Sequence, residues 1–111
     1  MRPDDTIDPA EAHRIEAVQM SEKTFQQRIR NLAEEMGWRV YAVYDSRKTP
    51  AGWPDLTLVK GERLCFWELK SQRGKTTESQ NEWLAELAAT GAETAVYRPA
   101  DYELIVRMLN A

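Results

Sequence analysis

The sequence predicts an α/β protein in which a mixed four-stranded sheet carries helices on both faces, a three-layer αβα arrangement with an αβββαβ core. Two apolar runs, 56–60 and 64–70, flank a short Gly-Glu turn and predict an antiparallel hairpin. A helical apolar period at 77–90 precedes a β-rich run at 93–98, which predicts a parallel strand reached by a right-handed crossover. The 111 residues suffice for one domain with a single core.

The first part of the chain contains two helix-start signals. Asp8-Pro9-Ala10-Glu11 places Asp at the N-cap, Pro at N1 and Glu at N3, and predicts a short helix to about residue 18. Its apolar stripe is thin and consists of Ala12, Ile15 and Val18. Ser21 is expected to cap a second helix that ends near Gly37. We therefore expect residues 1–20 to form a partly helical N-terminal extension and residues 21–111 to form the main domain.

The remaining elements follow from β propensity, turn residues and caps. Residues 38–44 are rich in β-branched and aromatic residues and predict the first strand. We expect 71–76 to be a flexible basic loop. Thr77 and Gln80 match a capping box that starts the third helix, whose inward residues are expected to be Trp83, Leu84, Leu87 and Ala88. The last helix opens at Pro99, and its apolar stripe is Tyr102, Ile105, Met108 and Leu109.

The hairpin predicts a cluster of charged side chains at its open end. With Gly61 and Glu62 as the loop residues of a type II′ turn, Lys60 faces Arg63 and, by the same register, Asp55 faces Glu68. Opposed residues point to the same face, and so does Lys70, two residues beyond Glu68. Two adjacent carboxylates need a cation or a proton to relieve their repulsion, and hard oxygen ligands suit Mg²⁺ or Mn²⁺. The sequence therefore predicts a divalent metal site beside a lysine.

A purely structural interpretation of the same residues explains less. Asp55 would be a turn residue after a proline, and Glu68 with Lys70 would be a surface ion pair. However, Glu68 and Lys70 end a strand that is otherwise apolar on both faces, where charges without a task are costly. Two other polar residues have ordinary structural explanations: the helix dipole accounts for Glu22, and capping accounts for Gln80.

Charge is unevenly distributed along the chain. The formal net charge is −3, and 30% charged with 42% hydrophobic residues is ordinary for a globular protein. Basic residues outnumber acidic ones between residues 23 and 75, and much of the negative charge lies outside that stretch. Four cations in the two loops are candidate phosphate contacts, against the alternative that they only keep the surface soluble; they are Arg47, Lys48, Arg73 and Lys75.

Two absences in the sequence bear on location. No apolar run approaches the roughly 20 residues needed to cross a bilayer, so we expect no membrane partner. The single cysteine, Cys65, cannot form an internal disulfide and lies in a predicted core strand. These features favour a reducing compartment, and we expect the cytoplasm of a prokaryotic or phage-infected cell.

Taken together, these motifs resemble those of the PD-(D/E)XK nucleases and, more narrowly, of the VRR-NUC family of virus-type replication-repair nucleases. The resemblance covers about residues 21–101 and rests on Glu22, Gly52-Trp53-Pro54-Asp55, Glu68-Leu69-Lys70 and Gln80. It implies a restriction-endonuclease-like fold. It also implies that Asp55 and Glu68 hold the metal with the backbone carbonyl of Leu69, and that Lys70 is the catalytic lysine. By the same resemblance, Gln80 belongs to the catalytic site and Glu22 helps to hold the metal.

The resemblance implies a function as well. We expect a Mg²⁺- or Mn²⁺-dependent deoxyribonuclease, an endonuclease acting on branched or four-way junction DNA in replication, repair or phage DNA processing. Small stand-alone members tend to dimerise, so a homodimer is expected. One alternative is a non-catalytic DNA-binding module or a subunit of a larger nuclease complex, although the intact Asp55, Glu68 and Lys70 argue against it. Another is an interaction protein that exposes its four tryptophans, but aromatics at such periodic positions are more often core.

Overall fold

A four-stranded sheet in the order β1-β2-β3-β4 forms the centre of the molecule. The computed structural model describes residues 8–111, and the side chains of all of these except 13–15 and 46. The strands are β1 (Arg39–Ala42), β2 (Leu56–Lys60), β3 (Arg63–Leu69) and β4 (Glu93–Tyr97). The first two pairings are antiparallel and the third is parallel. The predicted mixed sheet is therefore confirmed.

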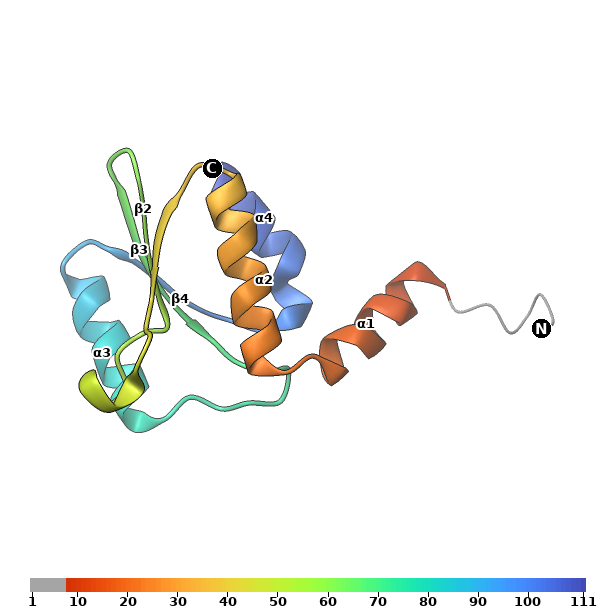
Figure 1. The fold of residues 1–111 in the computed structure, drawn as a ribbon, viewed down its shortest axis with the longest axis horizontal. Helices are drawn as coiled ribbons and strands as arrows, with labels where there is room; N and C mark the ends of the chain where they lie inside the picture. The colour runs from red at the N-terminus through yellow and green to blue at the C-terminus, as the bar shows by residue number, and fades with distance from the viewer. Residues whose placement is uncertain (1–7) are drawn as a thin grey trace.

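Helices lie on both sides of this sheet (Figure 1). One face carries α2 (Glu22–Glu35) and α4 (Tyr102–Asn110), and the other carries α3 (Glu78–Ala89). The main core lies between the sheet and the α2–α4 pair, because the inward side chains of β2 and β3 are apolar there except for Lys60 and Arg63 at the turn end. Its buried members include Phe25, Ile29, Leu56, Leu58, Cys65, Trp67, Leu69, Ile105 and Leu109. The three-layer prediction holds, with unequal layers.

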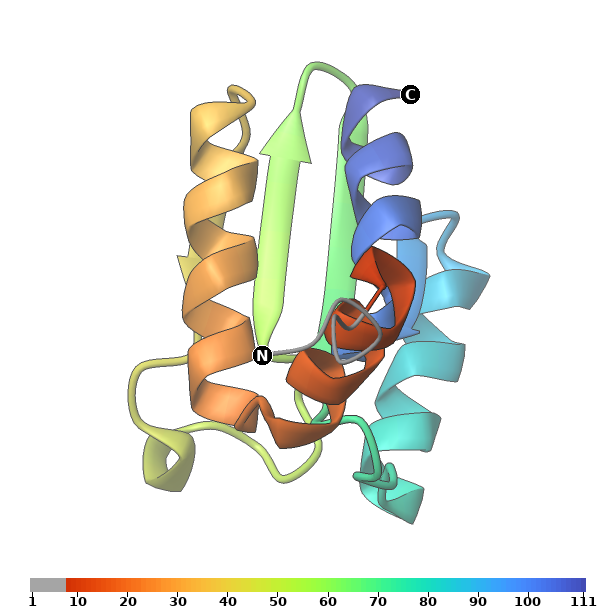
Figure 2. The same ribbon diagram turned by 90° about the vertical axis from the view of Figure 1, so that its right-hand side faces the viewer.

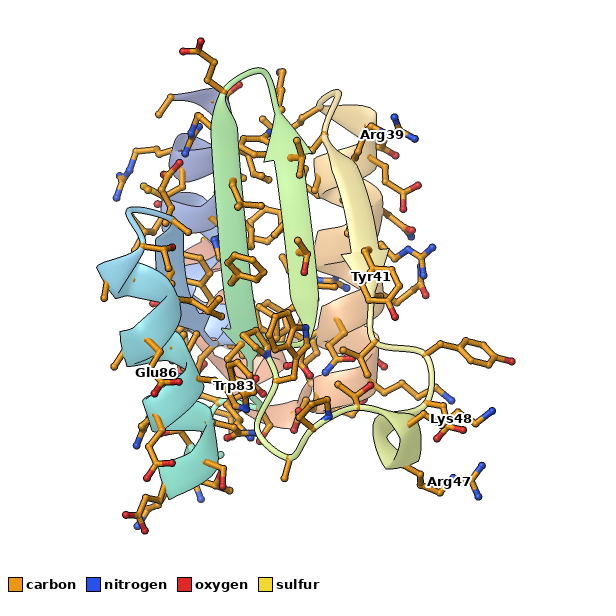
Figure 3. The ribbon with its side chains drawn as sticks, turned by 90° about the vertical axis from the view of Figure 1, so that its left-hand side faces the viewer. Arg39, Tyr41, Arg47, Lys48, Trp83 and Glu86 are labelled. Carbon is orange, nitrogen blue, oxygen red and sulfur yellow. The ribbon has the colours of Figure 1, made fainter. Side chains whose placement is uncertain are left out.

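The α3 face is covered only in part. Tyr41, Val59 and Leu64 lie exposed on it, and Figure 3 shows Tyr41 on the uncovered portion beside β1. The capping box at Thr77 and Gln80 forms as predicted. Of the four inward residues expected in α3, Leu84 is buried, but Ala88 is exposed. The prediction for Ala88 is wrong because this helix covers only part of the sheet face and buries a narrow stripe.

The N-terminal helix α1 (Pro9–Gln19) stands beside the domain in Figure 1, and it lies in front of the domain in Figure 2, where that side faces the viewer. Asp8 accepts hydrogen bonds from the N–H groups of Ala10 and Glu11, as the cap prediction requires. The predicted stripe is wrong, since Ala12 and Val18 are exposed and Ala17 is buried instead; the side chain of Ile15 lies outside the described residues. The helix touches the body mainly at the short helix η3 (Pro99–Asp101), so one small residue suffices at the contact.

Two further predictions need correction. The first strand is shorter than the expected 38–44, because only Arg39–Ala42 pairs with β2. Trp38 instead enters the core, and its indole N–H donates to the carbonyl oxygen of Leu109 at 3.1 Å. The loop 71–76 is not loose: the Arg98 guanidinium donates twice to the Gly74 carbonyl oxygen, at 2.8 and 3.2 Å. Within residues 8–111 no helix is both long and apolar enough to span a membrane.

Candidate metal centre

The hairpin between β2 and β3 positions the first two acids. Its register pairs Lys60 with Arg63 and Leu56 with Trp67, as the sequence predicts. Gly61 has a φ of +60°, and Glu62 does not have a positive φ, which agrees with a type II′ turn. The same register carried one step further places Asp55, just before β2, opposite Glu68 near the end of β3.

Three carboxylates converge at this end of the sheet. Glu22, Asp55 and Glu68 each offer an oxygen atom, and these atoms all lie within 4.8 Å of one another. They come from the first turn of α2, the residue before β2, and β3. Glu22 lies in the first turn of α2, where the helix dipole favours an acid, and it also belongs to the acidic cluster. The two explanations of this residue are therefore compatible. A cluster of three acids at this spacing requires a cation or protons.

Asp55 also fixes the backbone beside it. One of its carboxylate oxygens, Oδ2, accepts a hydrogen bond from the Leu69 backbone N–H at 2.8 Å. This bond crosses the open end of the hairpin, where the regular β2–β3 ladder has ended. The Leu69 side chain is fully buried in the core, so its backbone is held from both sides. The Glu68-Leu69-Lys70 segment is therefore rigidly positioned against Asp55.

Glu68 is the most deeply buried of the three acids, with 1% of its surface exposed. Its Oε1 accepts a hydrogen bond from the Gln80 amide at 3.1 Å and lies 3.8 Å from the Lys70 ammonium. Its Oε2 has no hydrogen-bond partner within residues 8–111. Burial and then the neighbouring Asp55 raise the pKa of Glu68 to about 9, against the opposing effect of Lys70.

This arrangement fits a hard divalent cation. A buried carboxylate oxygen without a partner is costly, and a cation in the middle of the acidic cluster would satisfy Oε2 of Glu68. Carboxylate oxygens are the ligands that Mg²⁺ and Mn²⁺ prefer. Lys70 is itself nearly buried, with 9% of its surface exposed, and supplies one positive charge against three acids. That imbalance leaves room for the charge of a divalent ion.

Gln80 acts at two places at once. Its Oε1 accepts a hydrogen bond from the Thr77 backbone N–H at 2.9 Å, which is half of the capping box. Its Nε2 donates to Oε1 of Glu68. The cap thereby fixes which end of the amide faces Glu68. Gln80 is therefore both a capping residue and a partner of the buried acid. Thr77 and the start of α3 are in this way part of the support of Glu68.

The loop before Asp55 forms one wall of a cavity of about 160 Å³ that opens onto Asp55, Glu68 and Gln80. The Trp53 ring packs edge-on against Trp83 of α3, with 4.9 Å between ring centroids. The Trp83 indole N–H donates to the Ala51 carbonyl oxygen at 3.1 Å. These contacts join the loop to α3, and Figure 3 shows Trp83 where the helix meets the loop.

The four predicted phosphate contacts are exposed and lie on two loops at the metal-centre end of the sheet (Figure 1). Arg47 and Lys48 belong to the short helix η2 (Ser46–Lys48) and point away from the sheet (Figure 3). Arg47 pairs with Asp45 at 3.1 Å, and this contact lowers the pKa of Asp45. Such an exposed pair is weak, so the guanidinium can exchange partners. Arg73 and Lys75 lie on the anchored loop after Lys70.

Comparison with known proteins adds the family. Residues 6–101 match the VRR-NUC domain family. The chain belongs to the VRR-NUC family. Among solved structures, one described as a VRR-NUC domain aligns over 79% of this chain and 97% of its own length, with 17% identity and a TM-score of 0.64. Hjc, a Holliday junction resolvase of Archaeoglobus fulgidus, aligns over 65% of this chain and 62% of its own, with 21% identity and a TM-score of 0.52. No curated protein matches the sequence.

For this VRR-NUC domain the likeness to both structures bears out the expected restriction-endonuclease-like fold, and at these identities it shows the fold alone. Sequence reasoning did not predict the contacts that Gly52 and Gln26 make beside the acidic cluster. Gly52 packs against Ser79 so closely that a Cβ would lie 2.5 Å from the Ser79 carbonyl carbon. Gln26 donates to Glu22 at 3.5 Å. The sequence signals were a glycine two residues before a Pro-Asp pair and, for Gln26, a position one helical turn after Glu22 on the same side of the helix.

Proposed function

We propose that this VRR-NUC domain is a metal-dependent DNA nuclease that hydrolyses phosphodiester bonds with Mg²⁺ or Mn²⁺ bound by Glu22, Asp55 and Glu68. The observation that carries the proposal is the buried, unpartnered oxygen of Glu68 within a cluster of three carboxylates from three elements. The Leu69 backbone carbonyl completes the proposed set of ligands: it belongs to the residue whose N–H is bonded to Asp55, and its own peptide unit is fixed by the Lys70 N–H, which donates to the Tyr97 carbonyl oxygen.

When bound, the cation polarises the phosphate and lowers the pKa of a coordinated water. The protein supplies the rest of the chemistry. Lys70 is positioned to orient the water or to stabilise the negative charge that develops on the phosphate oxygens. A bond forms from the water oxygen to phosphorus as a P–O ester bond breaks. Gln80 holds Glu68 in place during this exchange through its amide.

The four loop cations would hold the DNA backbone. Arg47, Lys48, Arg73 and Lys75 contact phosphates rather than bases in this proposal, so they carry no sequence code. Selectivity would then come from DNA shape, and the likeness of the fold to a Holliday junction resolvase supports a branched or four-way substrate. A homodimer acting in the cytoplasm would present two such sites to a two-fold junction. Sedimentation of the protein with and without junction DNA tests that stoichiometry.

The decisive test of activity is cleavage of linear, nicked, flapped and four-way DNA in Mg²⁺, in Mn²⁺ and in chelator. We expect metal-stimulated cleavage, strongest on branched DNA, and a loss of about a hundredfold or more in Asp55→Asn and Lys70→Ala. Asn retains an acceptor for the Leu69 N–H, so the fold is preserved. Lys60→Ala is the matched control, because Lys60 lies at the opposite, turn end of the hairpin.

Two results would contradict the proposal. Undiminished cleavage by purified Asp55→Asn or Lys70→Ala would remove the mechanism. Salt-dependent DNA binding with no metal-stimulated cleavage of any substrate would favour the alternative, a DNA-binding module or a subunit of a larger nuclease complex.

A further inference from the structure

A second hollow lies directly beside the metal centre. Its volume is about 340 Å³, and it separates α2 from the end of β1. The α2 side is lined by polar and basic side chains, and the other side by the end of β1 and residues that follow it. The lining residues that matter here are Lys23, Gln26, Gln27, Arg30, Val43 and Tyr44. We call this hollow the α2–Tyr44 groove.

The groove adjoins the cavity at the acidic cluster. Val43 lines both the groove and the cavity that opens onto Asp55 and Glu68. The Val43 backbone N–H donates to the Asp55 carbonyl oxygen at 3.1 Å, so this wall is fixed to the metal-binding loop. On the opposite wall, Gln26 donates to Glu22. A DNA strand held at the acidic cluster would therefore have the groove beside it.

The α2 wall has the chemistry of a phosphate-binding surface. Lys23 and Arg30 are exposed cations, and no acidic side chain lines the groove among the described residues. Arg30 pairs with Glu34 at 3.0 Å, but both side chains are about half exposed, so the pair is weak and a phosphate can replace it. A chain of phosphates would neutralise the uncompensated positive charge on this wall.

The facing rim of the groove carries an aromatic residue whose side chain is almost fully exposed. Tyr44 is 98% exposed, more than any other large hydrophobic side chain described as exposed; Tyr41 follows at 60%. An isolated exposed aromatic is not unusual by itself. Here Tyr44 lies at the rim of a groove whose other side is basic, next to the acidic cluster, and its ring is free for a base to stack on. Aromatic rings next to cations are the combination on which unpaired nucleotides stack and are held.

We propose that the α2–Tyr44 groove binds an unpaired stretch of the substrate strand next to the cleaved bond, with one base stacked on Tyr44 and phosphates held by Lys23 and Arg30. This inference rests on the proposed function and narrows it. It assigns the enzyme to DNA with single-stranded nucleotides beside the cleavage point, as in a flap or a splayed junction arm. Fully paired DNA would gain nothing from Tyr44, because its bases are already stacked on each other.

Fluorescence anisotropy with a labelled oligo(dT) and a labelled blunt duplex, in chelator, tests the groove without any need for cleavage. We expect Tyr44→Ala to weaken oligo(dT) binding by about tenfold and leave duplex binding unchanged. Tyr44→Phe keeps the ring and should bind as the unsubstituted protein does. Lys23→Gln should weaken oligo(dT) binding and lower the slope of its salt dependence by about one. Tyr41→Ala is the matched control, because Tyr41 is exposed on the uncovered sheet face (Figure 3).

The same variants are then assayed for cleavage of a flapped and a blunt substrate with Mn²⁺. We expect Tyr44→Ala to slow cleavage of the flap only. The groove proposal fails if Tyr44→Ala binds oligo(dT) as tightly as the unsubstituted protein, or weakens both DNA forms equally. If no DNA is cut but the Tyr44-dependent preference for oligo(dT) remains, the nuclease proposal fails and the groove stands. If DNA is cut and Tyr44→Ala changes neither binding nor cleavage, the groove proposal fails and the nuclease proposal stands.

Discussion

At the scale of single residues, Glu68 and its partner Gln80 are the most informative part of the acidic cluster. Glu68 brings an ionisable group into a nearly sealed position and leaves one oxygen without a partner among the described residues. The Gln80 amide oxygen accepts a hydrogen bond at the start of α3, and its amide nitrogen donates a hydrogen bond to Glu68. The side chain that caps α3 therefore also orients the buried acid, which couples local helix stability to the chemistry of the site.

A pair of substitutions separates these two tasks of Gln80. Gln80→Glu keeps an acceptor for the Thr77 N–H but replaces the donor to Glu68 with a fourth carboxylate, so we expect the helix cap to form and cleavage to slow about tenfold or more, with any loss of stability coming from the added acid. Thr77→Ala removes the hydroxyl cap and leaves the Gln80–Glu68 contact, so we expect a loss of about 1 kcal/mol in unfolding free energy with cleavage retained.

Urea denaturation and cleavage rates of the two variants check this expectation. Equal cleavage by Gln80→Glu and the unsubstituted protein would leave Gln80 as a capping residue only. The sequence already predicted the facing positions of Asp55 and Glu68, because side chains in a strand alternate strictly and the Gly61 turn sets the register. It could not reveal the double contact of Gln80, since either task alone explains a glutamine at that position.

At the scale of elements, the loop before Asp55 is held by its close approach to α3. Gly52 has a φ of +89°, and an added Cβ would meet the backbone and side chain of Ser79 at 2.5–2.7 Å. Trp53 and Trp83 continue the same contact. The glycine thus lets the loop lie against the helix that carries Gln80, and the loop places Asp55 in the acidic cluster.

Gly52→Ala should therefore damage both stability and activity. We expect it to lower the unfolding free energy by about 2–4 kcal/mol, because a positive φ is unfavourable for alanine and the new methyl group overlaps backbone atoms. Gly61→Ala is the matched control: its φ is +60°, but no atom lies within 4 Å of the added Cβ. It should cost about 1 kcal/mol and leave metal binding intact. Equal effects in thermal unfolding would show that the contact with Ser79 is unimportant.

Element boundaries were predicted less well than element types. The helix caps at Asp8, Ser21 and Thr77 form as expected, because a cap is a hydrogen bond between residues only two or three positions apart in the sequence. The extent of β1 and the inward side of α3 depend on how far a neighbouring element reaches, which a local pattern does not record. Tyr44, expected inside a strand, lies beyond the end of the β1–β2 ladder for that reason.

At the scale of the whole molecule, the two ends of the sheet have different tasks. At the turn end, Arg63 forms a two-bond ion pair with Glu93 of β4 at 2.7 and 2.8 Å and donates to the Met108 carbonyl oxygen of α4. Its guanidinium also lies 4.9 Å from the Trp38 ring centre. At the open end, three elements contribute acids to one cluster. Opposite charges are thus paired at the turn end of the sheet, whereas the open end carries an excess of acids that a cation would neutralise.

The pH dependence of metal binding follows from the buried acid. With its pKa raised to about 9, Glu68 carries a proton at neutral pH in the metal-free protein. A cation needs the ionised carboxylate, so binding must release that proton. Apparent affinity should accordingly rise with pH up to about 9 and then level off. Because the ligands come from α2, the β2 entry and β3, a bound cation should also stabilise the whole domain.

Calorimetric titration of Mn²⁺ into the DNA-free protein, repeated in two buffers of different ionisation enthalpy at pH 7, tests the central claim most directly. We predict saturable binding with release of about one proton per protein, lost in Asp55→Asn and retained in Lys60→Ala. The proton release should disappear in Glu68→Gln. Absence of binding at millimolar Mn²⁺, or binding unchanged in Asp55→Asn, would contradict a metal centre built from Glu22, Asp55 and Glu68.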